Sequence, residues 1–298
     1  MATFYGEKEA NILKTWLYLT GMSLFVVAVG WGVSYYTGSY LFLWFALLIS
    51  IFSSFYSYFY SDKLVLKMSN AEKIDKKDYP EYVRIVENLT MAEGMPMPEL
   101  YILHESQPNA FATGRNPENS VIAVTEGLLR VMDRTELEAV LAHELSHIKN
   151  RDILLQTVVV VLAATVAFLS RIFVRSTIFG RRNNNKGGVI TLVIALLAAI
   201  LAPLVATIIK LAVSRKREYL ADSSAALMTR HPEALADALQ KIKDYPKSMQ
   251  VASDATAHLY IINPFREDGD AGQKWIHKLF STHPPLEDRI SKIRGIDV

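Results

Sequence analysis

The stretch AVLAHELSHIKNRD, from Ala139 to Asp152, decides how the chain is interpreted. It places His143 and His147 four residues apart, with Glu144 directly after the first histidine. On a helix, two imidazoles with this spacing share one face and can bind one zinc ion, and the glutamate can reach a water molecule at the metal. The alternative is a solvated helix face that happens to carry two histidines, and three fixed residues do not by themselves decide between the two.

A helix is predicted around this stretch. Asp133 is a suitable N-cap and Glu136 completes a capping-box pattern, so the helix is expected to run from there through Arg151. At about 100° per residue, its apolar residues form one stripe and the two histidines project roughly from the opposite side. The stripe consists of Leu137, Leu141, Leu145 and Ile148. It can hold the helix in a core while the histidines face a cavity.

A zinc hydrolase needs a third protein ligand, which must be a histidine or a carboxylate because the chain contains no cysteine. The segment SRKREYLAD places Glu218 and Asp222 four residues apart on a second predicted helix. Glu218 can complete a site of two histidines and one glutamate, and Asp222 can orient a ligand histidine by accepting its other ring N–H. The alternative for this pair is an exposed acidic face balanced by the basic residues 215–217. His283 and Asp222 itself also remain open as third ligands.

Composition and hydropathy predict membrane segments beside a normally polar part. Hydrophobic residues make up 51% of the 298-residue chain, and the formal net charge of +2 gives no indication of a nucleic-acid partner. Residues 15–61 contain no charged side chain and are interrupted by the polar aromatic run 35–39, which predicts two spans joined by a tight turn. Residues 153–174 and 188–209, the latter with a kink at Pro203, predict a third and a fourth span.

The sequence between these hydrophobic blocks indicates a globular part with helices and strands. Residues 78–94 have the apolar spacing of a helix, which ends at a Gly-Met-Pro sequence. Three short runs, ELYIL, NAFAT and SVIAV, are separated by turn residues and are predicted to form a small sheet.

Taken together, the motifs resemble a known family. LAHELSHI, a hydrophobic hairpin, SRKREYLAD and THPPLEDRI follow in the order found in membrane zinc metalloproteases of the M48 group, HtpX type, and the resemblance covers almost the whole chain. It implies an α+β membrane protein with a mostly helical, zincin-like (gluzincin) catalytic domain, a small β-sheet and about four transmembrane helices. The expected parts are an N-terminal transmembrane hairpin (1–61), the first part of the catalytic domain with the H-E-x-x-H helix (62–152), a second hydrophobic hairpin (153–213) and the second part of the catalytic domain with the third zinc ligand (214–298).

The resemblance also implies roles for individual residues. One zinc ion (Zn2+) per chain is expected to be bound by His143, His147 and Glu218, with Glu144 as the catalytic base and Asp222 behind the ligands. Zinc would activate a water molecule for attack on a peptide bond while Glu144 takes up its proton.

Two further segments match parts of the family pattern near the active site. His283, a candidate for stabilising the oxyanion, and Arg289 match a C-terminal pair. The segment QPNAFATG matches a strand that borders the substrate groove, with Asn109 nearest the metal. The substrate-binding candidates are Asn109, Ala110, Phe111 and Ala112. An extended substrate can add to such an edge strand through main-chain hydrogen bonds.

The implied function is that of a multi-pass endopeptidase in the bacterial inner membrane, with a cytoplasmic catalytic domain, that degrades misfolded or damaged membrane proteins. Most basic residues near the span ends fit this orientation, but those within residues 171–186 do not. A prenyl-protein endopeptidase of the CAAX-processing type would use the same ligands, although that type implies more spans and a larger chamber. A membrane adaptor without activity is a third alternative, against which the intact Glu144 argues.

Overall fold

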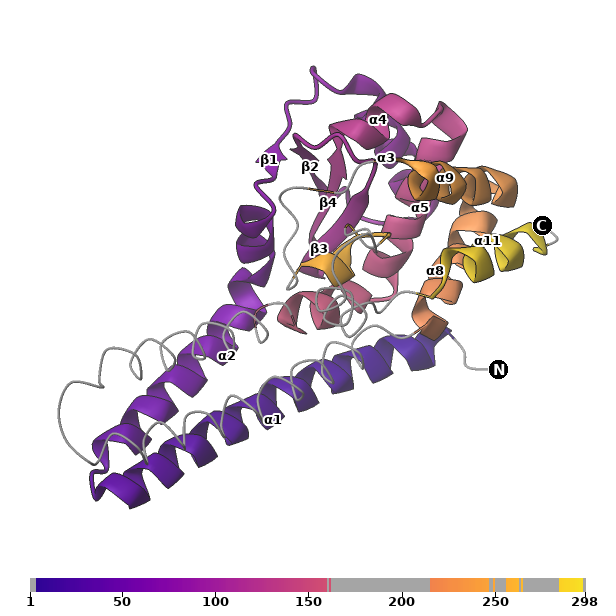
Figure 1. Cartoon of the computed structure of the whole chain (residues 1–298). Coiled ribbons are helices and arrows are strands. Elements are labelled where there is room, and N and C mark those ends of the chain that lie inside the picture. The colour runs from indigo at the N-terminus through magenta and orange to yellow at the C-terminus, as the bar shows by residue number, and fades with distance from the viewer. Residues whose placement is uncertain are drawn as a thin grey trace.

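The structure, a computed structural model, describes residues 4–159, 161, 215–246, 249, 256–262, 264 and 284–296. A long helical hairpin, formed by α1 and α2, projects from a body in which helices pack around a four-stranded sheet (Figure 1). The N-terminal end of α1 and the C-terminal end of α2 both lie at this body, whereas the turn between them lies far from it (Figure 1).

The hairpin consists of α1 (Phe4–Thr37) and α2 (Leu41–Met68). The chain turns between them at Gly38, whose φ of +70° suits glycine, and this turn confirms the predicted break at 35–39. The apolar stretch Glu9–Tyr35 of α1 has 27 residues, so it extends about 40 Å, more than the roughly 30 Å core of a bilayer. Only 17% of the most apolar window of each helix is buried. Both helices are therefore long and apolar enough to cross a membrane, and their exposed surface suits lipid.

Four strands form the sheet in the order β1-β2-β4-β3. Their bounds are β1 Glu72–Lys73, β2 Glu99–Leu103, β3 Ala110–Asn116 and β4 Asn119–Thr125. β2 and β4 are parallel, whereas the pairs β1–β2 and β3–β4 are antiparallel. The three predicted strands are confirmed, and β3 lies at one edge of the sheet.

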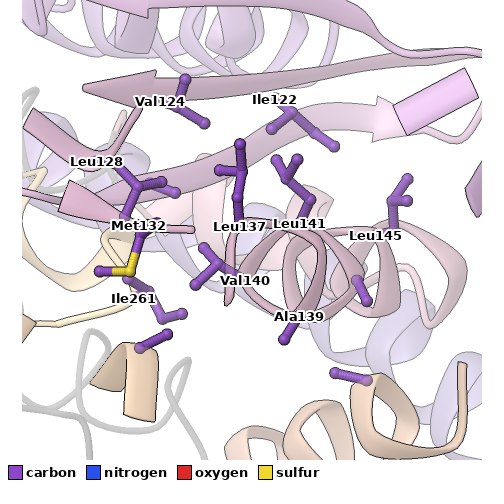
Figure 2. Close-up of a cluster of buried hydrophobic side chains, with 14 of the residues drawn as sticks. Ile122, Val124, Leu128, Met132, Leu137, Ala139, Val140, Leu141, Leu145 and Ile261 are labelled. Carbon is purple, nitrogen blue, oxygen red and sulfur yellow. The ribbon is translucent and has the colours of Figure 1, made fainter. Parts of the chain in front are cut away.

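Alternate side chains of the sheet pack against different helices, as the two-residue period of a strand requires. Ile122 and Val124 of β4 belong to the cluster on the face that α5 (Arg134–Lys149) covers (Figure 2). The residues between and before them, Val121 and Ala123, pack in a second cluster with the last turns of α2. The C-terminal end of α2 therefore belongs to the body that carries the sheet.

The N-terminus of α5 is fixed by the predicted capping box. The Asp133 carboxylate accepts the backbone N–H of Glu136 at 2.9 Å, and the Glu136 carboxylate accepts the backbone N–H of Asp133 at 2.8 Å. The helix ends at Lys149, two residues before the predicted end, because Asn150 caps it and Arg151 adopts a φ of +58°, outside the helical region.

The remaining described elements surround α5. They are α3 (Pro80–Ala92), α4 (Glu126–Val131), α8 (Arg215–Thr229), α9 (Pro232–Asp244), the short 3-10 helix η2 (Ala257–Leu259) and α11 (Leu286–Arg294). α8 and α9 pack against α5, on the side opposite the sheet (Figure 2). The predicted helix at 78–94 is thus confirmed as α3.

Two predictions about the chain's organisation are not tested in full. The proposed third and fourth spans, 153–174 and 188–209, lie outside the described residues, apart from residues 153–159 and 161, which are helical. Within the described part of the chain, α1 and α2 are the helices that could cross a membrane. The proposed boundary between 1–61 and 62–152 falls inside α2, which continues to Met68.

Candidate metal centre

The two histidines of the H-E-x-x-H motif lie deep inside the protein. His143 is 0% and His147 is 5% exposed, so the interpretation of this motif as a solvated helix face is wrong. They lie one turn apart on α5, whose leucine stripe packs toward the sheet (Figure 2). Their rings face α8, where Glu218 and Asp222 lie.

Glu218 and Asp222 contact different histidines and different ring nitrogens. Glu218 Oε1 lies 3.7 Å from His147 Nε2, whereas Asp222 Oδ1 lies 3.0 Å from His143 Nδ1. The two carboxylates are only 1% and 2% exposed, so the alternative of an exposed acidic face is also wrong. Their positions agree with the predicted roles of a ligand and of a residue behind the ligands.

His143, His147 and Glu218 are arranged as a metal site. One potential ligand atom from each lies within 4.8 Å of the others, and this is the one such group found among the described residues. His143 Nε2 and His147 Nε2 are 3.2 Å apart. Two nitrogen ligands on a tetrahedral zinc ion, at Zn–N distances of about 2.0–2.1 Å, would be about 3.3 Å apart. The spacing of the two histidines is therefore compatible with a shared metal ion such as zinc, and Glu218 lies where it could be a third ligand.

The other ring nitrogen of each histidine faces an aspartate. His147 Nδ1 hydrogen-bonds Asp152 Oδ2 at 3.1 Å. His143 Nδ1 lies close to Asp222, although the ring N–H is not aligned with the carboxylate as in a regular hydrogen bond. Both aspartates favour the tautomer with the proton on Nδ1, which leaves both Nε2 lone pairs directed toward each other. Facing lone pairs require a cation between them, which can be a proton or a metal ion.

The electrostatic environment makes the two histidines unequal. Burial lowers the pKa of His143 to about 4, although the nearby Asp222 acts to raise it. Burial also acts to lower the pKa of His147, but the hydrogen bond with Asp152 and the negative charge of Glu218 raise this pKa to about 9. Without metal, His147 therefore holds the proton between the two rings. Metal binding must release that proton.

Glu144 is buried beside the ligands and does not belong to the ligand group. Burial raises its pKa to about 7 against the opposing positive charge of His147, and the negative charge of Glu218 adds to the increase. A hydrogen bond from the backbone of Ala112 in β3 acts in the other direction. A carboxyl group that titrates near neutral pH can both accept a proton and return it.

Arg289 on α11 fixes the position of Asp222. Its side chain is fully buried and donates two hydrogen bonds to the Asp222 carboxylate, from Nε at 2.9 Å and from Nη2 at 2.6 Å. Its Nη1 donates to the Ile261 carbonyl at 2.9 Å and lies 3.6 Å from Glu218 Oε2. Burial acts to raise the pKa of Asp222, but Arg289 and His143 hold this pKa below its usual value, so Asp222 is ionised. The predicted partner of Arg289, His283, lies outside the described residues.

The proposed substrate-binding strand lies at the sheet edge, but it is covered. The Ala110 carbonyl accepts the backbone N–H of Ile261 at 2.9 Å, and Asn109 Nδ2 donates to the Ile262 carbonyl at 3.0 Å. A segment that precedes α11 in the chain thus occupies part of the edge that was expected to be exposed. All four substrate-binding candidates are buried: Asn109, Ala110, Phe111 and Ala112.

Sequence reasoning missed two buried residues of this centre. Asp152 had a local signal, because it follows His147 by five residues in the same motif and is the carboxylate that reaches back to the ring. Asn11 of α1 donates to Asp152 and is 0% exposed. Its only signal was an amide side chain near the start of an apolar helix.

The sequence is similar to a family of peptidases. Residues 76–297 match the family described as Peptidase family M48. The relative named Protease HtpX homolog from Dictyoglomus thermophilum is 42% identical over 293 residues, covering 98% of this chain and 94% of the relative. The proteins of the same name from Thermoanaerobacter pseudethanolicus and Pyrococcus furiosus are 43% and 46% identical over 310 and 267 residues. These matches cover 99% and 89% of this chain, and 98% and 90% of the relatives.

The fold is similar to that of a solved structure. The crystal structure of S. mikatae Ste24p superposes with a TM-score of 0.50 at 16% sequence identity, covering 98% of this chain and 67% of the other. At this identity the similarity supports the arrangement of the elements and carries no conclusion about substrates.

Proposed function

Since this chain belongs to peptidase family M48, we propose that it is a membrane-anchored endopeptidase that uses one zinc ion bound by His143, His147 and Glu218. The observation that carries the proposal is the convergence of these three ligand atoms in the protein interior, next to a buried Glu144. A ligand set of two histidines and one glutamate is typical of catalytic zinc sites, in which the fourth position is open.

The chemistry of the proposed reaction divides between the metal and the chain. A bound zinc ion would activate water and polarise the carbonyl of the scissile peptide bond. Glu144 takes up the proton of the attacking water and then passes it to the leaving amine, a role that suits its pKa of about 7. Asp152 and Asp222 hold the rings of His147 and His143 from behind, so that both Nε2 atoms face the centre. His283 is the proposed donor to the oxyanion.

The substrates proposed are misfolded or damaged membrane proteins. Relatives named Protease HtpX homolog and the two apolar helices support a protease that works at a membrane. Extended segments would bind along β3 by main-chain hydrogen bonds, which select for unfolded chain more than for particular side chains. Because the Ala110 carbonyl is paired with Ile261, that pairing must open before a substrate can use this part of the edge.

The proposed location is the bacterial inner membrane, with several spans and with the catalytic domain in the cytoplasm. Lys63 and Lys67 on the last turns of α2 and Lys149 at the end of α5 belong to the part of the chain near the catalytic body, and they support this orientation. An excess of basic residues at span ends marks the cytoplasmic side.

Variants of α5 can distinguish the proposed metal ligands from the proposed catalytic base. Glu144→Gln should retain zinc and lose proteolysis of an unfolded casein substrate, because Glu144 acts on water and does not bind the metal. His143→Ala and His147→Ala should lose the metal. Glu138→Gln, the same change at a partly exposed position of the same helix, is the matched control and should keep both zinc and activity. Zinc loss in Glu144→Gln equal to that in the two alanine variants would refute the assigned roles.

The third ligand is tested on α8. Glu218→Ala should weaken zinc binding severely, whereas Asp222→Asn should cost roughly 10- to 100-fold in affinity or activity, as expected for a residue behind the ligands. His283→Ala should keep the metal and lower turnover by about 10²- to 10³-fold if it acts on the oxyanion. Retention of zinc by Glu218→Ala together with its loss in His283→Ala would reverse the assignment.

A further inference from the structure

Asn11 is an unusual residue for the helix on which it lies. α1 is apolar over most of its length and exposes large side chains such as Trp16 and Leu17, yet the Asn11 side chain is 0% exposed. Buried amides are costly unless their donors and acceptors are paired. The partners of Asn11 come from segments 139 or more residues away in the sequence.

The Asn11 amide joins two buried groups of opposite charge. Its Nδ2 donates to the Asp152 carboxylate and, at 3.3 Å, to the Asn150 carbonyl. Its Oδ1 accepts from Arg217 Nη1 at 3.2 Å. An amide side chain can donate to an anion through its nitrogen and accept from a cation through its oxygen. Aspartate at this position would repel Asp152, and an apolar residue would leave both charges without this partner.

Both partners of Asn11 are connected to metal ligands. Asp152 holds Nδ1 of His147 through its second oxygen, and the Asn11 amide holds its first. Arg217 directly precedes Glu218 on α8 and is 3% exposed. Within the described part of the chain, its Nε and Nη2 have no hydrogen-bond partner, which makes the bond to Asn11 the main constraint on this guanidinium.

The chain around Asp152 is shaped so that this contact can form. Arg151 adopts a left-handed conformation, with φ +58°, between the end of α5 and the helical residues 152–159. This conformation is unfavourable for a residue other than glycine. It turns the chain so that Asp152 lies between His147 and α1. Beyond Asp152, Leu154 and Val158 pack against Leu19 and Met22 of α1.

We propose that Asn11 is a positioning residue of the metal centre, through which the first membrane helix holds together the two segments that carry the ligands His147 and Glu218. The helix α1 is then a structural part of the site and not only an anchor. The inference rests on the proposed function in one respect, because it takes His147 and Glu218 as ligands.

Asn11→Leu tests the proposal in the full chain, in detergent or in lipid nanodiscs. Leucine has the same branched arrangement of side-chain heavy atoms as asparagine but no polar atom, so the change removes the hydrogen bonds, and the packing of Leu19 and Met22 holds α1 in place. Zinc affinity, measured by competition with a chromophoric chelator, should fall about 10- to 100-fold. Thr15→Val is the matched control, because Thr15 is equally buried on the same helix but bonds only the Asn11 carbonyl in the contacts described.

A second measurement distinguishes positioning from general destabilisation. The unfolding temperature is recorded for metal-free and zinc-loaded protein, and the rise on adding zinc should be smaller in Asn11→Leu than in the parent and in Thr15→Val. Asn11→Ala removes the same hydrogen bonds without adding any bulk. It should give the same result, and it decides the matter if Asn11→Leu does not fold.

Unchanged zinc affinity in these variants, with both unfolding temperatures lowered equally, would mean that Asn11 serves the fold alone, and the proposal would be overturned. If the proposed function is wrong, the result is different. The parent chain would then bind no zinc, or its zinc binding would be unchanged in His143→Ala.

Discussion

Arg289→Met should destabilise the protein severely, although methionine fills most of the volume of the arginine side chain. Arg289 is completely buried and supplies two of the hydrogen bonds of the Asp222 carboxylate. The substitution leaves Asp222 ionised and buried, with His143 as its remaining ionic partner among the described residues. Removing one partner of a buried ion pair costs about 3–5 kcal/mol, because the other charge remains without compensation.

This free energy can be read as a shift in the unfolding temperature. For a folded unit of 150–250 residues, 1 kcal/mol corresponds to about 2–4 °C, so Arg289→Met should lower the midpoint by about 6–20 °C. Asp222→Asn removes the charge from the other side. In the double variant Arg289→Met/Asp222→Asn no buried charge is left alone, so the loss should be clearly smaller than the sum of the two single losses.

The assay is thermal unfolding of the metal-free full chain in one detergent, followed by intrinsic tryptophan fluorescence. Arg289→Lys keeps a charge but cannot form two parallel hydrogen bonds, and it should fall between the parent and Arg289→Met. It also provides a measurement if Arg289→Met does not accumulate as folded protein. Additive losses in the double variant would refute the coupling. A midpoint for Arg289→Met within about 2 °C of the parent would also refute it, because such a shift corresponds to no more than about 1 kcal/mol.

Three further predictions concern other parts of the chain. Asp133→Ala removes the N-cap of α5 and should cost about 0.5–2 kcal/mol of stability while zinc affinity is unchanged; equal stability would show that the cap is not needed. Hydrogen bonds with Glu126 and Glu72 raise the pKa of His104 above its usual value. The contribution of these bonds to stability is therefore complete below about pH 6.5 and is lost as pH rises through the pKa of His104 in the folded protein. An NMR titration should show the raised pKa of His104, and this pKa should be lower in Glu126→Gln. Because the chain contains no cysteine, Ser39→Cys at the turn of the hairpin and Glu118→Cys beside the sheet should react with impermeant thiol reagents from opposite sides of the membrane, and labelling from one side would mean that the hairpin does not cross.

Much of the fold could be predicted from local patterns. The capping box at Asp133, the three strand segments and the break between α1 and α2 depend on residues close in sequence, and all were confirmed. The parallel pairing of β2 with β4, with β3 at the outside, could not be predicted in this way, because it depends on contacts between separated segments. The two-residue strand β1 was missed for a similar reason, since Glu72 and Lys73 are exposed and carry no strand pattern.

In the candidate site, too, local sequence patterns predicted some features, whereas features that depend on distant segments could not be predicted. Spacing alone placed His143 and His147 on one helix face, and the geometry of α8 agrees with the roles proposed for Glu218 and Asp222. Spacing could not show that this region is buried, and the exposed alternatives were wrong for that reason. The expected open edge of β3 was also beyond local reasoning, because the segment that pairs with Ala110 comes from residue 261.

The contacts behind the ligands repeat one arrangement at both histidines. Each ring faces an aspartate, and each aspartate is held by a donor from a distant part of the chain. Arg289 follows Asp222 by 67 residues, and Asn11 precedes Asp152 by 141 residues. One donor lies near the N-terminus and the other near the C-terminus, so the complete set of hydrogen bonds requires both ends of the chain in place. Because a misplaced ring lowers metal affinity, the proposed roles of Asn11 and Arg289 imply that the centre reaches its full affinity only when α1 and the C-terminal helix α11 have both packed against it.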